Sequence, residues 1–240
     1  MPDVRSNRRS VVASSAERDR VESMQHLGCT SCRRRPSGIE LRLDCAIHLL
    51  DEICRGCVVH HGVVSVDDLV RQACSRVPRL GATRLVAIDG PGGAGKSTLA
   101  ALLAETCHGH VLHTDDFASW ENPLDWWCRL EEEVLRPVAA GRIGRYQRYD
   151  WNLRALAEWH TVTTGGVLIL EGVSSSRAAV RERLTLSIWV ETPRHIRLAR
   201  GLARDGGGAK TIWEQWMNEE DVHFASDRTR EHADAIVCGT

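Results

Sequence analysis

The sequence predicts an α/β fold in which a mostly parallel sheet is covered by helices on both faces. Two observations favour it. Short apolar runs at 85–88 and 167–170 are typical of buried strands, and they alternate along the chain with helix-length segments. A glycine-rich loop at 90–95 lies between such a strand and a helix. We expect the folded domain to occupy residues 65–240, and we expect residues 1–64, which begin with an Arg- and Ser-rich stretch, to form a largely disordered N-terminal extension.

Each element follows from apolar spacing and from the residues that start or stop it. Ser65 predicts an N-cap for an amphipathic helix over 66–77, which Pro78 and Gly81 end. Pro137 marks the last turn of a helix over 124–140, and Pro193 opens a helix that runs to 204. The other expected elements are strands at 84–89, 111–114, 167–170, 184–190 and 235–237, helices at 39–53, 97–106, 153–160 and 211–226, and a hairpin over 141–149.

Charge and hydropathy exclude several classes of protein. The formal net charge is −1, which argues against a general nucleic-acid binder and against a polybasic membrane binder. No apolar run approaches the roughly 20 residues that span a bilayer. The first 20 residues contain arginines but no apolar core of a secretory signal, so we expect a cytoplasmic protein that acts on a small molecule.

Two features of the composition leave alternatives open. The nine cysteines do not indicate a disulfide scaffold, because the chain is long and the count is odd. Two C-x₂-C pairs lie close to zinc-ribbon spacing but in a segment with few strand signals, so they are either zinc ligands or fortuitous. Five of the eight tryptophans lie between 120 and 159 and either line a pocket or fill the core. The paired cysteines are Cys29, Cys32, Cys54 and Cys57.

The sharpest motif is GPGGAGKST at 90–98, which fits G-x-x-x-x-G-K-[ST] between a strand and a helix. Its glycines let backbone N–H groups point at phosphate oxygens, and the helix N-terminus adds a partial positive charge. Lys96 would reach the β- and γ-phosphates, and the Ser97 hydroxyl would bind Mg²⁺. The motif therefore predicts a P-loop NTPase three-layer sandwich that binds a nucleoside triphosphate together with Mg²⁺, and the nucleotide is ATP if the protein is a kinase. The expected nucleotide-binding residues are Gly90, Pro91, Gly92, Gly93, Ala94, Gly95, Lys96, Ser97 and Thr98.

The size of the domain and the absence of an Asn-Lys-x-Asp guanine-reading motif favour a compact kinase over a motor ATPase or a GTPase. A kinase needs a group that orients and deprotonates the acceptor hydroxyl. Asp115 follows the second predicted strand, at the strand end where ligands lie in a parallel sheet, although it or Asp116 could instead cap a helix. Glu171 follows a buried strand and is either a Mg²⁺ partner or an exposed strand-end acid.

From 85 to 237 the chain resembles the uridine kinases of the uridine kinase and phosphoribulokinase group. Order and spacing of several motifs agree, which makes the resemblance more specific than the loop alone. The matching motifs are the loop at 88–98, Asp115-Asp116-Phe117, Asn122-Pro123, Tyr149-Asp150-Trp151, Glu171-Gly172-Val173, Arg200, Arg204-Asp205 and Ala233-Asp234-Ala235-Ile236-Val237.

The resemblance implies a role for each matching residue. Asp115 corresponds to the family's catalytic aspartate, the base for the 5′-hydroxyl of a pyrimidine nucleoside. Glu171 corresponds to the acid near Mg²⁺. Arg200 and Arg204 lie in the helix that leads to the family's lid, where arginines neutralise charge on the transferring phosphoryl group. The family's Tyr-Asp-Phe, which covers the nucleoside, corresponds to Tyr149, Asp150 and Trp151.

The departures from the family pattern fall on the acceptor side. Trp151 replaces the usual Phe, and the expected lid at 205–210 is short and glycine-rich. Three alternatives to a uridine kinase stay open: a cytidylate-type kinase, another small-molecule kinase, and a non-catalytic ATP-binding regulator. The cytidylate kinases begin with a similar loop, but their Thr-Gly-x-x-Tyr-Arg segment is absent from this sequence.

Overall fold

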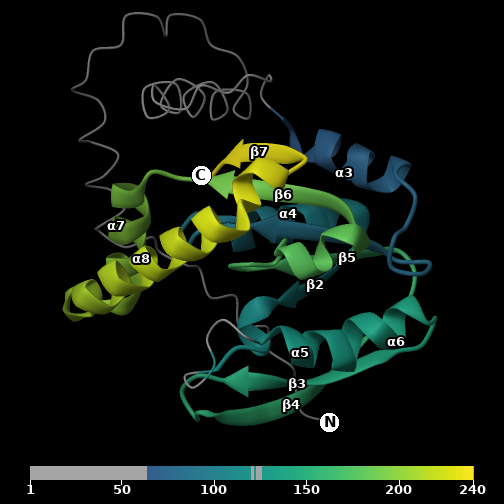
Figure 1. Ribbon diagram of the computed structural model, residues 1–240, viewed down its shortest axis with the longest axis horizontal. Helices are drawn as coiled ribbons and strands as arrows, with labels where there is room; N and C mark the ends of the chain where they lie inside the picture. Colours follow the sequence, from purple (N-terminus) through teal and green to yellow (C-terminus); the bar gives the residue numbers. More distant parts are fainter. Residues whose placement is uncertain (1–63, 120–121, 123–125, 240) are drawn as a thin grey trace, which may run out of the picture. The chain divides into compact units, whose positions relative to one another are not determined.

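A computed structural model describes residues 64–119, 122 and 126–239 of the chain (Figure 1). Its contacts divide the chain into two units, Met1–Cys57 and Val58–Thr240, and the described residues belong to the second. The expected helix at 39–53, the four paired cysteines and nearly all of the expected extension lie outside the described residues. Within the described part, no helix is long and apolar enough to cross a membrane.

The elements alternate as the sequence predicts, apart from the segment between β2 and β5. The α-helices are α3 (Val66–Ser75), α4 (Lys96–Cys107), α5 (Trp127–Leu130), α6 (Arg136–Ala139), α7 (Arg194–Asp205) and α8 (Lys210–Asp227). The strands are β1 (Arg84–Asp89), β2 (His110–His113), β3 (Gly144–Asp150), β4 (Ala155–Val162), β5 (Val167–Glu171), β6 (Leu184–Glu191) and β7 (Ala235–Cys238). Short 3₁₀ helices cover Thr114–Asp116, Ala178–Arg183, Gly207–Ala209 and Thr229–His232, and a π-helical segment covers Glu131–Leu135.

Five strands form one parallel sheet in the order β2-β5-β1-β6-β7. Strand β1 is central, and its side chains alternate between two cores. Leu85 and Ala87 pack on the side of α5, α6 and the β3-β4 hairpin, whereas Val86 and Ile88 pack on the side of α3 and α4. The prediction of a three-layer α/β fold is confirmed.

The helix expected over 124–140 is present from 127 to 139, but its middle is a π-helical turn. Pro137 has no backbone N–H, so the carbonyl of Glu133 lacks its usual helical donor at this point. The missing bond permits the wider turn, in which Arg136 N–H donates to the Glu131 carbonyl five residues earlier.

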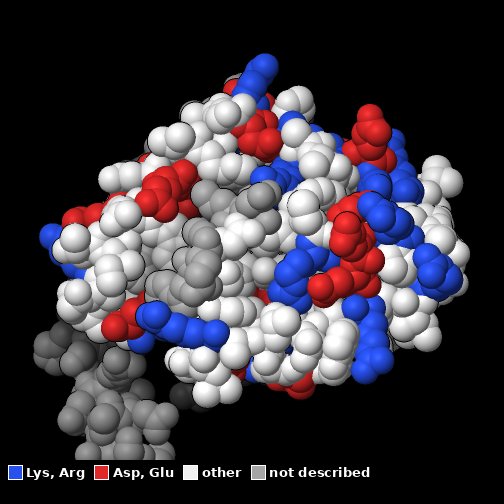
Figure 2. Space-filling model, turned by 60° about the horizontal axis from the view of Figure 1, so that its bottom comes forward, with Lys and Arg blue, Asp and Glu red and all other residues white. Residues whose placement is uncertain are grey.

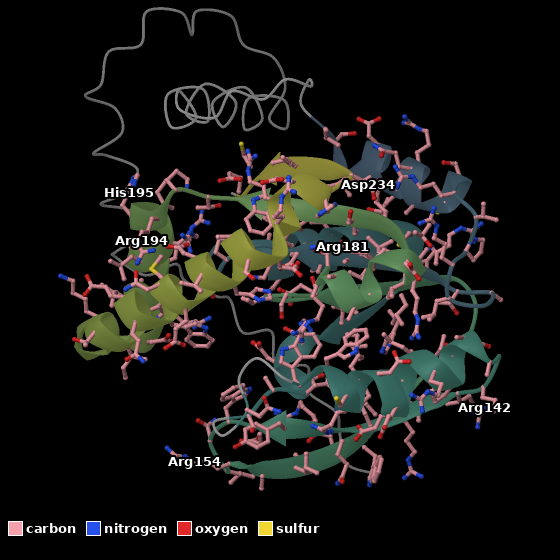
Figure 3. The ribbon with its side chains drawn as sticks, viewed as in Figure 1. Arg142, Arg154, Arg181, Arg194, His195 and Asp234 are labelled. Carbon is pink, nitrogen blue, oxygen red and sulfur yellow. The ribbon has the colours of Figure 1, made fainter. Side chains whose placement is uncertain are left out.

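The prediction of a helix over 153–160 is wrong, because residues 155–160 belong to strand β4 and residues 153 and 154 to the turn before it. It pairs antiparallel with β3, so 141–149 is one arm of a longer hairpin, whose two ends are marked in Figure 3 by Arg142 and Arg154. The cross-strand pairing overrides the helix propensity of Ala, Leu and Glu in the segment. Tyr146 stacks on His160 with ring centres 5.3 Å apart, and Arg148 forms an ion pair with Glu158 at 2.6 Å.

Helices α7 and α8 pack closely because Gly201 has no side chain. A Cβ added there would overlap the Trp213 indole, which is 5 % exposed. We therefore expect Gly201→Ala to lower the free energy of unfolding by about 1–3 kcal/mol, as overpacking does. Urea denaturation measures it. Gly208→Ala is the control, because nothing lies within 4 Å of its added Cβ, and equal stability of the two variants would contradict this packing.

Candidate active site

The glycine-rich loop runs from β1 into α4 and is anchored by Asp89, the last residue of β1. This fully buried carboxylate accepts hydrogen bonds from the backbone N–H of Gly90 at 2.7 Å, Ser174 at 2.9 Å and Ser176 at 2.8 Å. Desolvation raises the pKa of Asp89, although the hydrogen bonds from Gly90 and Ser176 act in the opposite direction. Sequence reasoning missed this residue, although an acid that ends an apolar strand just before the glycines is an available signal.

A cleft of about 570 Å³ opens along the loop, at the C-terminal ends of β2 and β5 and beneath α7 and α8. Seven of the nine loop residues line it, from Gly92 to Thr98. The cleft also brings together four other predicted residues: Asp115, Glu171, Arg200 and Arg204. Gly90, Pro91, Tyr149, Asp150 and Trp151 are not among the lining residues.

Lys96 and Ser97 point their side chains to different partners in this cleft. Lys96 is 7 % exposed, and its ammonium donates to the Pro91 carbonyl at 3.0 Å, so the side chain folds back over its own loop. The Ser97 hydroxyl donates to Glu171 Oε1 at 3.2 Å. The two oxygens expected to hold Mg²⁺ therefore converge, and hydroxyl and carboxylate oxygens suit that hard cation.

The residues present fit a Mg²⁺ ion that keeps water and phosphate ligands. In the described part of the chain, no group of three or more His, Cys, Asp or Glu residues could hold a metal ion. Mg²⁺ in kinase sites is typically bound through one or two protein oxygens together with the substrate's phosphates. Ser97 and Glu171 supply two such oxygens.

His113 is a residue of the cleft that sequence reasoning missed. It ends β2 directly opposite Glu171 in the β2-β5 register, and its Nδ1 lies 2.7 Å from Glu171 Oε2. The Glu171 carboxylate thus joins the loop serine to the end of β2. The hydrogen bond to Glu171 raises the pKa of His113, and burial opposes this shift.

We expect the His113 imidazole to titrate above about 6.5, the ordinary histidine value. A raised histidine pKa stabilises the fold fully below about 6.5, and the contribution disappears as the pH rises through the folded-state pKa. An NMR titration of the imidazole measures the shift. Glu171→Gln should move the pKa down towards the ordinary value, and a wild-type pKa at or below 6.5 would contradict the pairing.

Asp115 and Asp116 have different environments although they are adjacent. The Asp115 side chain is exposed in the cleft, where partial desolvation, followed by the charge of Glu171, raises its pKa, while the charge of Lys96 opposes the shift. It accepts no hydrogen bond from the described residues. The Asp116 carboxylate accepts one from the Tyr146 hydroxyl at 2.8 Å. Asp115 is therefore the carboxylate left available to a ligand in the cleft.

Arg200 and Arg204 come to the cleft from α7. Arg200 donates to the Gly93 carbonyl of the loop at 3.2 Å. Arg204 pairs with Asp205 at 2.8 Å and lies over the Trp213 ring, 5.4 Å from its centre. Arg200 therefore lies against the phosphate loop, and Arg204 lines the same cleft, where its charge interacts with Asp115.

The predicted nucleoside-binding residues lie at the end of β3, outside the lining of the cleft. Asp150 accepts from the backbone N–H of Asn152 and Leu153, both at 2.9 Å, and so organises the turn to β4. The buried Tyr149 hydroxyl has no hydrogen-bond partner in the described structure. Trp151 reaches the site most directly, because its indole N–H donates to the Asp115 carbonyl at 3.1 Å.

Among the described residues, the tryptophans that line the cleft are Trp213 and Trp216, and none comes from the tryptophan-rich segment. Of the latter, Trp126 is buried in the core, and Trp127 and Trp151 pack against that core. Trp159 is 55 % exposed under Arg145, and Trp120 lies outside the described residues.

On the face that Figure 2 draws, basic and acidic side chains are interspersed rather than gathered by sign.

The known proteins that this chain is similar to include kinases. No family model matches the chain. It is 32 % identical over 133 residues to a cytidylate kinase of Edwardsiella ictaluri, covering 53 % of this chain and 58 % of that protein. It is 24 % identical over 176 residues to a uridine kinase of Borrelia hermsii, covering 64 % of this chain and 85 % of that protein.

A solved structure of another protein has a similar fold. A possible uridine kinase from Bacillus stearothermophilus matches 72 % of this chain and 96 % of its own, with a TM-score of 0.55 and 17 % identity. The resemblance to uridine kinase-like P-loop kinases is confirmed, and so is the P-loop three-layer fold. The chain spans little more than half of the cytidylate kinase, so its own reaction is a matter for proposal.

Proposed function

We propose that this chain transfers the γ-phosphoryl group of ATP to the 5′-hydroxyl of a pyrimidine nucleoside. The observation that carries the proposal is the position of Asp115, which shares the cleft with Lys96, Ser97 and Glu171. A carboxylate that shares a cleft with a phosphate loop and accepts no hydrogen bond from the described residues can orient and deprotonate an acceptor hydroxyl. We assign this activity to residues 65–240.

In the proposed reaction, the acceptor oxygen forms a bond to the γ-phosphorus, and the bond from that phosphorus to the β,γ-bridging oxygen breaks. The hydroxyl proton passes to the Asp115 carboxylate, and ADP leaves. Backbone N–H groups of the loop and the Lys96 ammonium hold the β- and γ-phosphates. Arg200 and Arg204 offset the charge on the group in transfer. Ser97 and Glu171 would hold Mg²⁺, which when bound would neutralise charge on the phosphate oxygens.

The acceptor has a second candidate, a pyrimidine nucleoside monophosphate. The 32 % identity to a cytidylate kinase favours it. The absence of the Thr-Gly-x-x-Tyr-Arg segment and the longer match to uridine kinases, 85 % of the protein from Borrelia hermsii, favour the nucleoside. A binding protein without turnover fits less well, since Lys96, Ser97, Asp115 and Glu171 are all present.

A panel of acceptors tests the proposal. Purified full-length protein is given ATP and Mg²⁺ with uridine, cytidine, CMP, UMP or no acceptor, and ADP formation is followed. We expect ADP release to rise with uridine or cytidine and to stay at background without acceptor. Turnover with the monophosphates alone would select the second candidate, and ATP binding without turnover on the panel would contradict the proposed reaction.

A further inference from the structure

The carboxylate of a glutamate in α8 accepts a hydrogen bond from the backbone of the phosphate loop. The Glu220 side chain is 2 % exposed, and both of its carboxylate oxygens lie 3.0 Å from the backbone nitrogen of Gly92, which donates to them. A Cβ added at Gly92 would lie 3.0 Å from Glu220 Oε1. The carboxylate is therefore seated directly against the loop, in the same cleft as Lys96.

The setting of Glu220 is that of a bound anion. Desolvation raises its pKa, while the Gly92 hydrogen bond and the charges of Lys96 and Arg197 oppose the shift. Arg197 is itself buried, and its Nη1 lies 3.6 Å from Glu220 Oε2. A backbone N–H of the loop and two cations are the groups that such a loop offers to phosphate oxygens. Glu220 accepts from the Gly92 N–H and lies beside Arg197, and the charge of Lys96 acts on it from within the same cleft.

We propose that Glu220 competes with nucleotide phosphates for the phosphate loop. The phosphates of the nucleotide must either displace the Glu220 carboxylate or bind close to its negative charge, which repels them. This inference rests on the proposed function, because it assumes that ATP is the ligand of the loop. Two anions cannot share the Gly92 N–H without repulsion in a partly desolvated cleft. The carboxylate therefore lowers the affinity for nucleoside polyphosphates.

The helix that carries Glu220 also packs against the helix that carries the arginines of the site. On α8 the Trp213 indole packs against Gly201 of α7, and Arg194 of α7 binds Asp221 and, at 2.7 Å, Asn218 of α8. Figure 3 labels Arg194 near the start of α7. These contacts join the two helices on both sides of Glu220. Glu220 is thus connected through these contacts to α7, the helix that carries Arg200 and Arg204.

The test compares nucleotide affinity in Glu220→Gln with that of the wild type. Glutamine keeps the shape and an oxygen that accepts from Gly92, but it removes the charge. Isothermal titration with ATP and Mg²⁺ and no acceptor should give a Kd about tenfold lower in the variant. AMP, which has no β- or γ-phosphate, should bind both proteins alike. Glu219→Gln is the matched control, because it removes the same charge from the neighbouring exposed position, and its Kd should equal that of the wild type.

The outcomes separate this inference from the proposed function. If the wild type binds ATP and Glu220→Gln binds it equally well or more weakly, the competitor role is overturned and the kinase proposal stands. Binding by Glu220→Gln alone supports the role, and absence of ATP binding in all three proteins overturns both proposals. If Glu220→Gln unfolds, Glu220→Asp replaces it, since the shorter carboxylate must withdraw from Gly92, and tighter ATP binding is again expected.

Discussion

Lys96→Ala is expected to lower kcat on the order of 10³-fold or more while the fold persists. The Lys96 ammonium lies over the loop at 3.0 Å from the Pro91 carbonyl, and its charge acts on Asp115 and Glu220 in the same cleft. Without it, no lysine remains to neutralise the charge that develops between the β- and γ-phosphates. The measurement is steady-state turnover with ATP and the best acceptor of the panel.

The chain contains a matched control for this variant, because Lys210 is the only other lysine. It lies at the start of α8 with a side chain that is 62 % exposed, and it is not among the residues that line the cleft. Lys210→Ala should keep kcat within about twofold of the wild type, because exposed charges of this kind contribute little. Full turnover in a well-folded Lys96→Ala protein would remove the loop from the mechanism.

Asp115→Asn is expected to lower kcat on the order of 10²-fold or more, with ATP affinity kept or improved. Asparagine can still accept a hydrogen bond from the acceptor hydroxyl, but it cannot take the proton. Because partial desolvation and Glu171 raise the pKa of Asp115, wild-type kcat should rise with pH as this carboxyl ionises and then level off. The variant should lose that rising limb.

Asp116→Asn is the control for the loss of a carboxylate at this strand end. Its amide oxygen can still accept from the Tyr146 hydroxyl, so we expect kcat to fall by less than about tenfold. The pH dependence of Asp116→Asn should match that of the wild type. A larger loss in Asp116→Asn than in Asp115→Asn would reverse the assignment of the base.

The parts of the structure that the sequence predicted depend on local rules. The strand, glycine-rich loop and helix around Lys96 are consecutive, so their spacing alone defines the phosphate site. The alternation of apolar strands with helices likewise defines the sheet and its two covering layers. Asp115 and Glu171 were found because strand ends in a parallel sheet meet at one edge.

The parts that were missed depend on contacts between distant segments. Whether 155–162 is helix or strand depends on its partner β3, which no local pattern reveals. His113 gains its role only because β2 pairs with β5 in a register that sets it opposite Glu171. Glu220 is 128 residues from Gly92 and lies in a helix that sequence reasoning treated as a covering element.

The central claim is that the loop and Asp115 act together to move a phosphoryl group from ATP to a small-molecule hydroxyl. The most direct test follows the γ-phosphate itself, with ATP labelled at that position, Mg²⁺ and the preferred pyrimidine nucleoside. The account predicts one labelled nucleoside 5′-monophosphate for each ADP formed, with the label absent from the product of Lys96→Ala. Label that appears only in inorganic phosphate, at the same rate with and without the nucleoside, would contradict it.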